Sequence, residues 1–345
     1  MISWGVARTI AVTLASRTEG TVPARHGAFD YPGAVREALV PLAGFTGIRL
    51  NDDVRPVRVA DRAEWIDFNI GGFGALLEPI LERATKSADN VTWVFGTAAL
   101  TAQVGLLLGF LSARVLGQYD TGPLVASKKG SSRKPGEPGE IFFLDGNIVA
   151  AAGRLGVPVD GLRLWIVLHE TTHALQFEGH PWLRDYLGSL VELFTAPLAE
   201  RLGVGETLRR LAGNFKTGAR TLELVMTPDQ RRIFETLQAT MSVIEGYSDY
   251  VMHHVGKGLV PGYENIKERM SRSRAHRPPL ETAIFRLTGL DQKLEQYRLG
   301  EEFADAVVKR VGMEGLNRVW ERPENMPTLE EIRDPGLWMG RLEAA

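Results

Sequence analysis

The chain has 345 residues, no cysteine and a formal net charge of −2. This length is enough for one large domain or for two closely packed parts. Without cysteine, disulfide bonds, thiol chemistry and cysteine-ligated zinc are excluded, so histidine, aspartate and glutamate remain as the strong metal ligands. The nearly neutral charge argues against a general nucleic-acid-binding protein, and we expect no nucleic-acid partner.

Two stretches near the start of the chain bear on location. Residues 1–15 place Arg8 inside a mildly apolar run without a convincing signal-peptide cleavage site, so we expect a helix of the fold and a cytoplasmic protein. Residues 93–112 carry no charge and contain Gly105-x-x-x-Gly109, a spacing typical of closely packed helices. Because this stretch barely reaches the thickness of a bilayer, a buried helix explains it better than a membrane span, and no membrane partner is expected.

Taken in chain order, the apolar periodicity predicts a mainly α-helical fold with a small β component. Helices are expected at 63–84, 91–116, 161–177, 186–202, 228–256, 264–274, 279–287 and 291–311. Strands are expected at 47–50, 56–59 and 140–149, the last with a turn at 145–147. Residues 127–140 are expected to form a solvated loop, and 320–341 a tail that wraps the surface. We interpret 1–345 as a single large domain, with a helical N-terminal part (1–125) and a second part (140–345) as its possible subdivision.

Details of sequence chemistry support several of these boundaries. Asp160 is the expected N-cap of the helix at 161–177, and Pro197 is expected to kink or restart the helix at 186–202. Thr227, followed by proline and by glutamine three residues later, predicts a well-capped helix start, and Gly256 predicts its end. The strand at 140–149 could also pair with an extended substrate backbone through main-chain hydrogen bonds.

The strongest chemical signal is His169-Glu170-x-x-His173, which follows the apolar run 164–168. Residues four apart lie on the same face of a helix, so the two imidazoles can bind one metal ion. Glu170 is rotated by about 100° around the helix axis from His169. Its carboxylate can therefore reach a metal-bound water without ligating the metal. The alternative is a chance motif of two satisfied core histidines. The metal site is favoured because only seven histidines occur in the chain and three lie between positions 169 and 180.

A catalytic zinc takes a third protein ligand, and two candidates compete for this position. Glu245 lies on the capped helix and shares a face with Asp249, which could accept a hydrogen bond from a ligand imidazole. His180 follows the motif, but the elongated zincin motif requires glycine and histidine at positions where this chain has Gln176 and Gly179. We therefore prefer Glu245 to His180.

The combination of His169-Glu170-x-x-His173 with a downstream Glu245-x-x-x-Asp249 resembles the gluzincin pattern. The wider sequence resembles a family of zincin-like metallopeptidases, catalogued as a domain of unknown function and sometimes labelled as associated with deazaflavin coenzyme biosynthesis. The segments that carry this resemblance are 118–120, 169–183, 296–297 and 317–338. The resemblance implies a mainly helical zincin-like fold that binds zinc, but it implies no particular substrate.

Residue by residue, the resemblance implies that His169, His173 and Glu245 bind the metal, that Glu170 is the general base and that Asp249 is the outer acceptor. Gluzincins also use a tyrosine or histidine to stabilise the developing oxyanion. The candidates for this donor are Tyr247, His253, His254 and Tyr297.

The leading hypothesis is a zinc-dependent hydrolase, most simply a metallopeptidase acting on a peptide or protein, in which Glu170 is the general base on a zinc-bound water. The alternative is a non-catalytic zincin-fold protein that binds zinc structurally or presents a groove to a partner. Retention of Glu170 favours the enzyme, because a structural site needs no base. A membrane-embedded peptidase would rest on 93–112 alone. Two imidazoles and one carboxylate suit zinc, although manganese, iron and nickel accept similar ligands.

Overall fold

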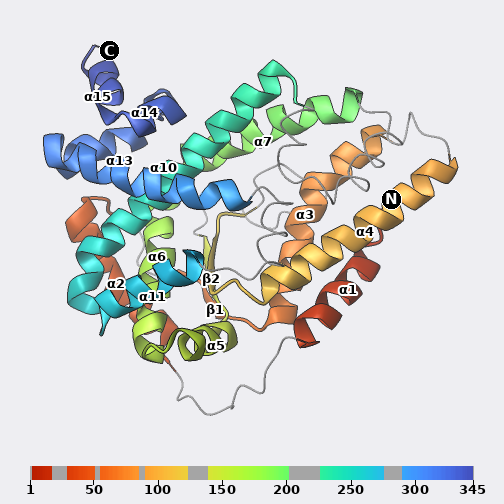
Figure 1. The fold of residues 1–345 in the computed structure, drawn as a ribbon, viewed down its shortest axis with the longest axis horizontal. Helices are drawn as coiled ribbons and strands as arrows, with labels where there is room; N and C mark the ends of the chain where they lie inside the picture. Colours follow the sequence, from red (N-terminus) through yellow and green to blue (C-terminus); the bar gives the residue numbers. More distant parts are fainter. Residues whose placement is uncertain are drawn as a thin grey trace.

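The computed structural model describes residues 2–17, 29–50, 55–84, 90–122, 139–201, 226–275 and 290–344. Within these ranges the chain is mostly helical and contains one three-stranded sheet, as the sequence predicted (Figure 1). The helix expected at 279–287 and residues 127–138 of the loop expected at 127–140 lie outside the described residues.

Most helices lie on predicted segments. The helix bounds are α1 (Trp4–Arg17), α2 (Tyr31–Thr46), α3 (Arg62–Ala84), α4 (Asn90–Ser112), α5 (Asp145–Leu155), α6 (Val159–Gly179), α7 (Trp182–Arg201), α10 (Pro228–Leu259), α11 (Tyr263–Ala275), α13 (Leu290–Asn317), α14 (Leu329–Arg333) and α15 (Pro335–Glu343). Of these, α2, α5, α14 and α15 were not predicted. Two 3-10 turns, η3 (Arg318–Trp320) and η4 (Pro323–Asn325), connect α13 to α14. The predicted capping box at Thr227 is confirmed, with both hydrogen bonds to Gln230 present.

Several predicted details of the helix boundaries differ from the structure. Asp160 is not the N-cap of α6 but lies in its first turn, where it accepts a hydrogen bond from Arg163 at 2.9 Å. Helix α7 continues through Pro197 as one helix, so no new helix begins there. Helix α10 passes Gly256, which lies against the ring of Tyr263 instead of ending the helix. Helix α4 ends four residues before the predicted end, because the chain then turns into a strand.

The sheet consists of β1 (Val57–Val59), β2 (Gly117–Asp120) and β3 (Glu140–Phe143). Their order is β1-β3-β2, with β3 parallel to β1 and antiparallel to β2. The predicted strand at 56–59 is confirmed, whereas β2 was not predicted. Since β3 is paired on both sides, its backbone cannot receive a substrate strand, and this expectation for 140–149 is wrong. The edge strand that packs on α6 is β2.

Two further strand predictions are also wrong. Residues 47–50 form no strand, because Gly47 ends α2 in the left-handed conformation with φ of 74°. Beyond Phe143 the chain does not continue as a strand or turn at 145–147: it enters α5, whose first residue, Asp145, accepts hydrogen bonds from Arg163 and Tyr31. The buried arginine therefore stabilises a helix start where the sequence suggested a turn.

The buried residues form two clusters. One lies between α1, α3 and α4, which are side by side at one end of the molecule (Figure 1). Here Gly105 and Gly109 of α4 lie against the backbone of α1, so the predicted close packing is confirmed. None of the described helices is long and apolar enough to cross a membrane. The second, larger cluster joins the sheet to α2, α5, α6, α10 and α13.

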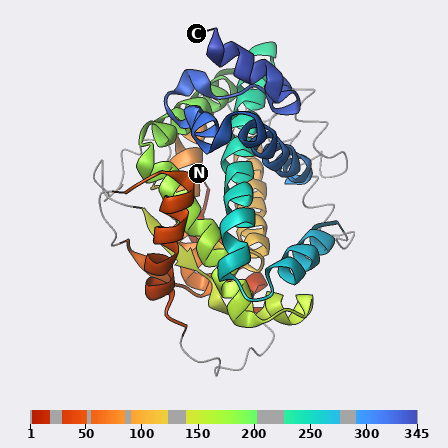
Figure 2. The same cartoon turned by 90° about the vertical axis from the view of Figure 1, so that its left-hand side faces the viewer.

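Helix α10 runs along the molecule beside α6 and is crossed by α13 (Figure 2). The crossing is close because Gly246 faces Gly300: a Cβ on Gly246 would lie 2.1 Å from the carbonyl carbon of Gly300. The C-terminal segment then packs onto this crossing. Trp320 and Trp338 are both 1% exposed, and the indole N–H of Trp338 donates to the carbonyl of Asn325 at 2.7 Å. The prediction of a surface tail at 320–341 is therefore wrong.

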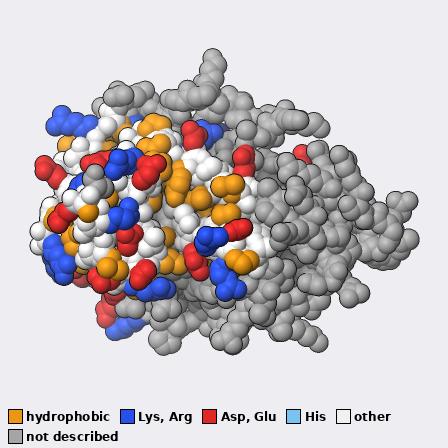
Figure 3. Space-filling view, turned by 90° about the horizontal axis from the view of Figure 1, so that it is seen from above, with side chains coloured by type: hydrophobic (Ala, Val, Ile, Leu, Met, Phe, Trp, Pro, Cys, Tyr) orange, Lys and Arg blue, Asp and Glu red, His pale blue; other side chains and the backbone are white. Residues whose placement is uncertain are grey.

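The surface agrees with the nearly neutral net charge. Seen from above, acidic and basic side chains are interspersed over the described part of the face, with hydrophobic side chains between them (Figure 3). This part of the face carries no extended region of a single charge.

Candidate metal centre

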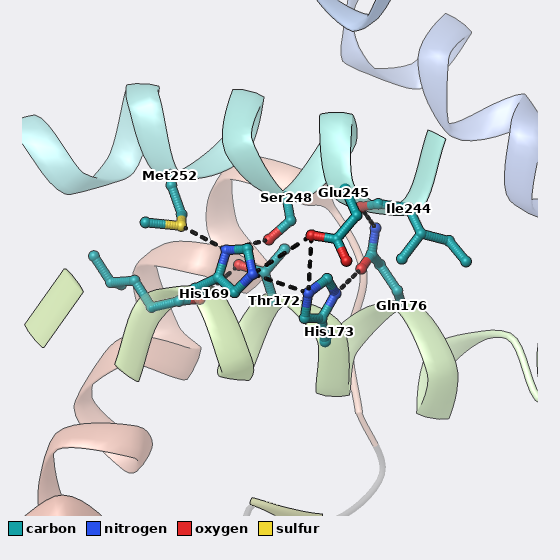
Figure 4. A network of polar contacts seen from close by, with 9 residues as sticks. His169, Thr172, His173, Gln176, Ile244, Glu245, Ser248 and Met252 are labelled. Atoms are coloured by element: carbon teal, nitrogen blue, oxygen red, sulfur yellow. Dashed lines mark hydrogen bonds and ion pairs between the residues drawn. The ribbon is translucent and has the colours of Figure 1, made fainter. Parts of the chain in front are cut away.

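His169 and His173 project from one face of α6 toward α10, where they meet Glu245 (Figure 4). The Nε2 atoms of the two rings are 3.1 Å apart, and Glu245 Oε2 lies 3.7 Å from one and 3.9 Å from the other. Ligand atoms bound tetrahedrally to zinc at about 2.0–2.1 Å lie roughly 3.3 Å from one another. The three atoms are thus spaced to converge on one ion, and two imidazoles with one carboxylate form a donor set that zinc accepts.

Each imidazole has further polar contacts at its outer nitrogen. His173 Nδ1 lies 2.8 Å from Gln176 Oε1, and the amide nitrogen of Gln176 donates to the carbonyl of Ile244 at 2.8 Å. His169 Nδ1 lies 3.3 Å from Ser248 Oγ and 3.2 Å from Met252 Sδ (Figure 4). Gln176, Ser248 and Met252 were not predicted as site residues. The signal that could have found them is helical spacing. Gln176 follows His173 by three residues, and Ser248 and Met252 follow Glu245 by three and seven residues.

Glu170 packs against strand β2. The residue is 6% exposed, and a Cβ on Gly117 would lie 2.8 Å from its Cγ and its Oε1. Only glycine therefore allows β2 to lie this close to the carboxyl group. Burial raises the pKa of Glu170 to about 7; the Glu245 carboxylate also raises it, while His173 and the main-chain N–H of Tyr119 oppose the shift.

A second carboxylate of α6 holds β2 in this position. Glu178 accepts hydrogen bonds from the hydroxyl of Tyr119 at 3.0 Å and from the main-chain N–H of Gly139 at 3.2 Å. It also forms an ion pair of 2.8 Å with Arg55, whose side chain is 1% exposed. Burial raises the pKa of Glu178, although Arg55 opposes the shift. The strand above Glu170 is thus tied to the same helix that carries the motif.

His180 lies apart from the group formed by His169, His173 and Glu245. It follows the last residue of α6, its Nδ1 donates to the carbonyl of Gln176 at 2.9 Å, and its ring stacks on Trp320. Burial lowers the pKa of His180. Its contacts are those of a packed residue at a helix end.

The candidates for an oxyanion donor, Tyr247, His253, His254 and Tyr297, differ in the residues that they contact. The hydroxyl of Tyr247 donates to Asn317 Oδ1 at 2.9 Å, and His253 Nδ1 accepts from Lys267 at 2.6 Å. The ring of His254 stacks on Phe45. The side chain of Tyr297 lies outside the described residues.

Asp249 lies one turn beyond Glu245 on α10 and is partly exposed. Its carboxylate helps to raise the pKa of Tyr263. The proposed role of Asp249 as an outer acceptor stays a prediction.

The chain belongs to the family of zincin-like metallopeptidases, whose family model matches residues 2–339. The predicted family is therefore confirmed. The chain is also similar to a protein from Chloroflexus aurantiacus whose crystal structure is described as that of "a putative hydrolase with a novel fold". The sequence identity is 35%, the similarity covers 100% of both chains, and the TM-score is 0.75. No curated protein gives a match.

Proposed function

We propose that this protein is a zinc-dependent hydrolase that cleaves peptide bonds. The observation that carries the proposal is the convergence of His169, His173 and Glu245 beside Glu170. Membership of the zincin-like metallopeptidase family supports a metal ion, usually zinc, at such a group. Zinc held there would lower the pKa of a coordinated water and polarise the carbonyl of a substrate.

In this proposal Glu170 moves the protons. Its carboxylate would accept a proton from the attacking water and later give it to the leaving amine. The main-chain N–H of Tyr119 points at the same carboxylate and orients it. Burial under β2 keeps bulk water away from this exchange.

The edge of β2 supports a peptide as the substrate. Among the described strands, β2 pairs only with β3, and it packs on α6 directly beside Glu170. An extended peptide can add to such an edge through main-chain hydrogen bonds, with its side chains alternating between two faces. The scissile carbonyl of a peptide bound there would lie close to the proposed metal centre.

The test combines metal content with one substitution. Purified protein is expected to carry about one zinc per chain, and His173→Ala is expected to lose it. Glu170→Gln is expected to keep the zinc while lowering the cleavage of a proteome-derived peptide library by about 10²–10⁴-fold, because an amide cannot accept the proton. Equal cleavage by both proteins would remove Glu170 from the mechanism. Zinc binding without any cleavage by the wild type would support the non-catalytic alternative.

A further inference from the structure

Gln176 connects the two helices of the metal centre through both ends of its amide. The side chain is fully buried, at 0% exposure. Its oxygen lies 2.8 Å from His173 Nδ1 on the same helix, and its nitrogen donates to the carbonyl of Ile244 on α10. Ile244 directly precedes Glu245, so the bridge runs from one proposed ligand to the neighbour of another (Figure 4).

The carbonyl of Ile244 determines which way this amide points. A carbonyl oxygen can only accept, so the NH₂ group of Gln176 must face Ile244 and its oxygen must face His173. The oxygen in turn can only accept, which requires the proton of His173 to be on Nδ1. In the neutral ring, Nε2 then has a free lone pair, and this is the atom that faces His169 and Glu245.

We propose that Gln176 is a positioning residue that selects the metal-binding tautomer of His173 and holds α6 in register with α10 before the metal binds. This inference rests on the proposed metal centre. The bridge differs in kind from the contacts of His169 with Ser248, because a hydroxyl can donate or accept and so does not select one tautomer. Selection by Gln176 makes His173 the preorganised member of the pair.

The first measurement is zinc affinity, determined by competition with a chromophoric chelator. Gln176→Leu removes both hydrogen bonds and is expected to weaken zinc binding by about 10–100-fold, as for other outer partners of metal ligands. Gln176→Glu keeps an acceptor for His173 but replaces the N–H donor to Ile244 by a carboxyl group, so its zinc affinity is expected to stay closer to that of the wild type than the affinity of Gln176→Leu does. An unchanged affinity in Gln176→Leu, or a loss in Gln176→Glu as large as that in Gln176→Leu, would overturn the proposal.

Asn317→Leu is the matched control. The amide of Asn317 also forms a two-sided bridge, accepting from the hydroxyl of Tyr247 and donating to the carbonyl of Thr46 at 2.6 Å. Its loss is expected to lower the free energy of unfolding as the loss of Gln176 does, but to leave zinc affinity unchanged. Equal weakening of zinc binding by both leucine variants would mean that Gln176 acts only through overall stability.

The second measurement is the tautomer itself. In the metal-free wild type, ¹⁵N NMR of histidine-labelled protein at about pH 8, above the ordinary imidazole pKa of about 6.5, is expected to show His173 protonated on Nδ1. The signal can be assigned by its absence in His173→Ala. Gln176→Leu is expected to show a mixture of tautomers. A wild-type His173 protonated on Nε2 would overturn the inference without any variant.

The two proposals fail in different ways. If the wild type binds no zinc, the metal centre is wrong and the inference falls with it. If the wild type binds one zinc and His173→Ala loses it, while Gln176→Leu binds as the wild type does, only the role of Gln176 is wrong.

Discussion

His173 and Glu170 lie three residues apart on α6 but have different surroundings. His173 faces α10 and reaches Glu245, while Glu170 is buried against β2. The environment of Glu170 comes from the strand as well as from its own helix, because burial against β2 raises the pKa of its carboxyl group.

The choice between Glu245 and His180 can be tested by single substitutions. Glu245→Ala is expected to reduce zinc binding severely, because its carboxylate oxygen lies near both Nε2 atoms. His180→Ala is expected to bind zinc as the wild type does, since its ring stacks on Trp320 at the end of α6. Zinc titration of the two variants decides between them. Retention of zinc in Glu245→Ala, together with its loss in His180→Ala, would contradict the gluzincin-like assignment.

Asp249→Ala gives an intermediate case. Loss of an outer partner typically costs about 10–100-fold in metal affinity or activity. We expect the zinc affinity of Asp249→Ala to fall between those of Glu245→Ala and His180→Ala in the same titration. A wild-type affinity would remove Asp249 from the centre.

Helix α10 places Glu245 through its length and its packing. It has 32 residues, begins with a capping box at Thr227, and is crossed by α13 directly at Gly246. The position of the proposed third ligand therefore depends on how closely two helices approach.

Gly246→Ala is expected to lower the free energy of unfolding by about 1–3 kcal/mol, because the added methyl group overlaps the backbone of Gly300 and forces the helices apart. Urea unfolding followed by circular dichroism measures the change. Gly258→Ala is the matched control on the same helix: a Cβ there meets no atom within 4 Å, so the replacement is expected to be neutral or stabilising. A similar loss in both variants would contradict the packing argument.

The start of α14 provides a prediction about pH. Glu331 is buried, accepts hydrogen bonds from Arg341 and from the N–H of Thr328, and has a pKa lowered below its usual 4.5 because these bonds outweigh the effect of burial. A carboxyl group with a lowered pKa stabilises the fold fully above its usual pKa. This stabilisation is lost as the pH falls through the folded-state value.

We therefore expect Glu331→Gln to lower stability near neutral pH by about 1–2 kcal/mol, with a difference from wild type that disappears in acid. Thermal unfolding at several pH values below about 5 and at neutral pH tests this. Glu330→Gln removes the same charge from the same helical turn at an exposed position and is expected to have little effect. A difference from wild type that persisted in acid would argue against Glu331.

At the scale of the whole molecule, the proposed metal centre joins helices that belong to one large core. Helix α6 supplies two ligands, α10 supplies the third, and α2, α5 and α13 pack around them. The smaller cluster of α1, α3 and α4 has its own buried residues. A metal that binds only the folded chain should therefore stabilise the larger core as a unit.

Free zinc at about a hundred times its Kd is expected to raise the free energy of unfolding by about 2.7 kcal/mol over the metal-free protein. Differential scanning calorimetry with chelator and with added zinc measures this difference as a shift in Tm. The control is His173→Ala, whose Tm is expected to be the same under both conditions. A zinc-dependent shift of equal size in this variant would place the metal elsewhere.

The sequence by itself determined the mainly helical class, the paired histidines on α6, the capped start of α10 and the resemblance to the zincin-like family. These features depend on local chemistry: helical periodicity, capping hydrogen bonds and the four-residue spacing of two imidazoles. Glu245 could be proposed for the same reason, because it lies on a helix that the sequence defined clearly.

Only the tertiary structure decided what surrounds those residues. The burial of Glu170 depends on Gly117, which lies in a four-residue strand too short to show a periodic pattern. The order of the strands, with β3 in the centre of the sheet, also comes from tertiary pairing. The bridge from Gln176 to Ile244 joins residues 68 positions apart, and a spacing rule within one helix does not reach that far. Contacts of this kind form only when separate elements pack, so their partners are set by the fold and not by any local stretch of the chain.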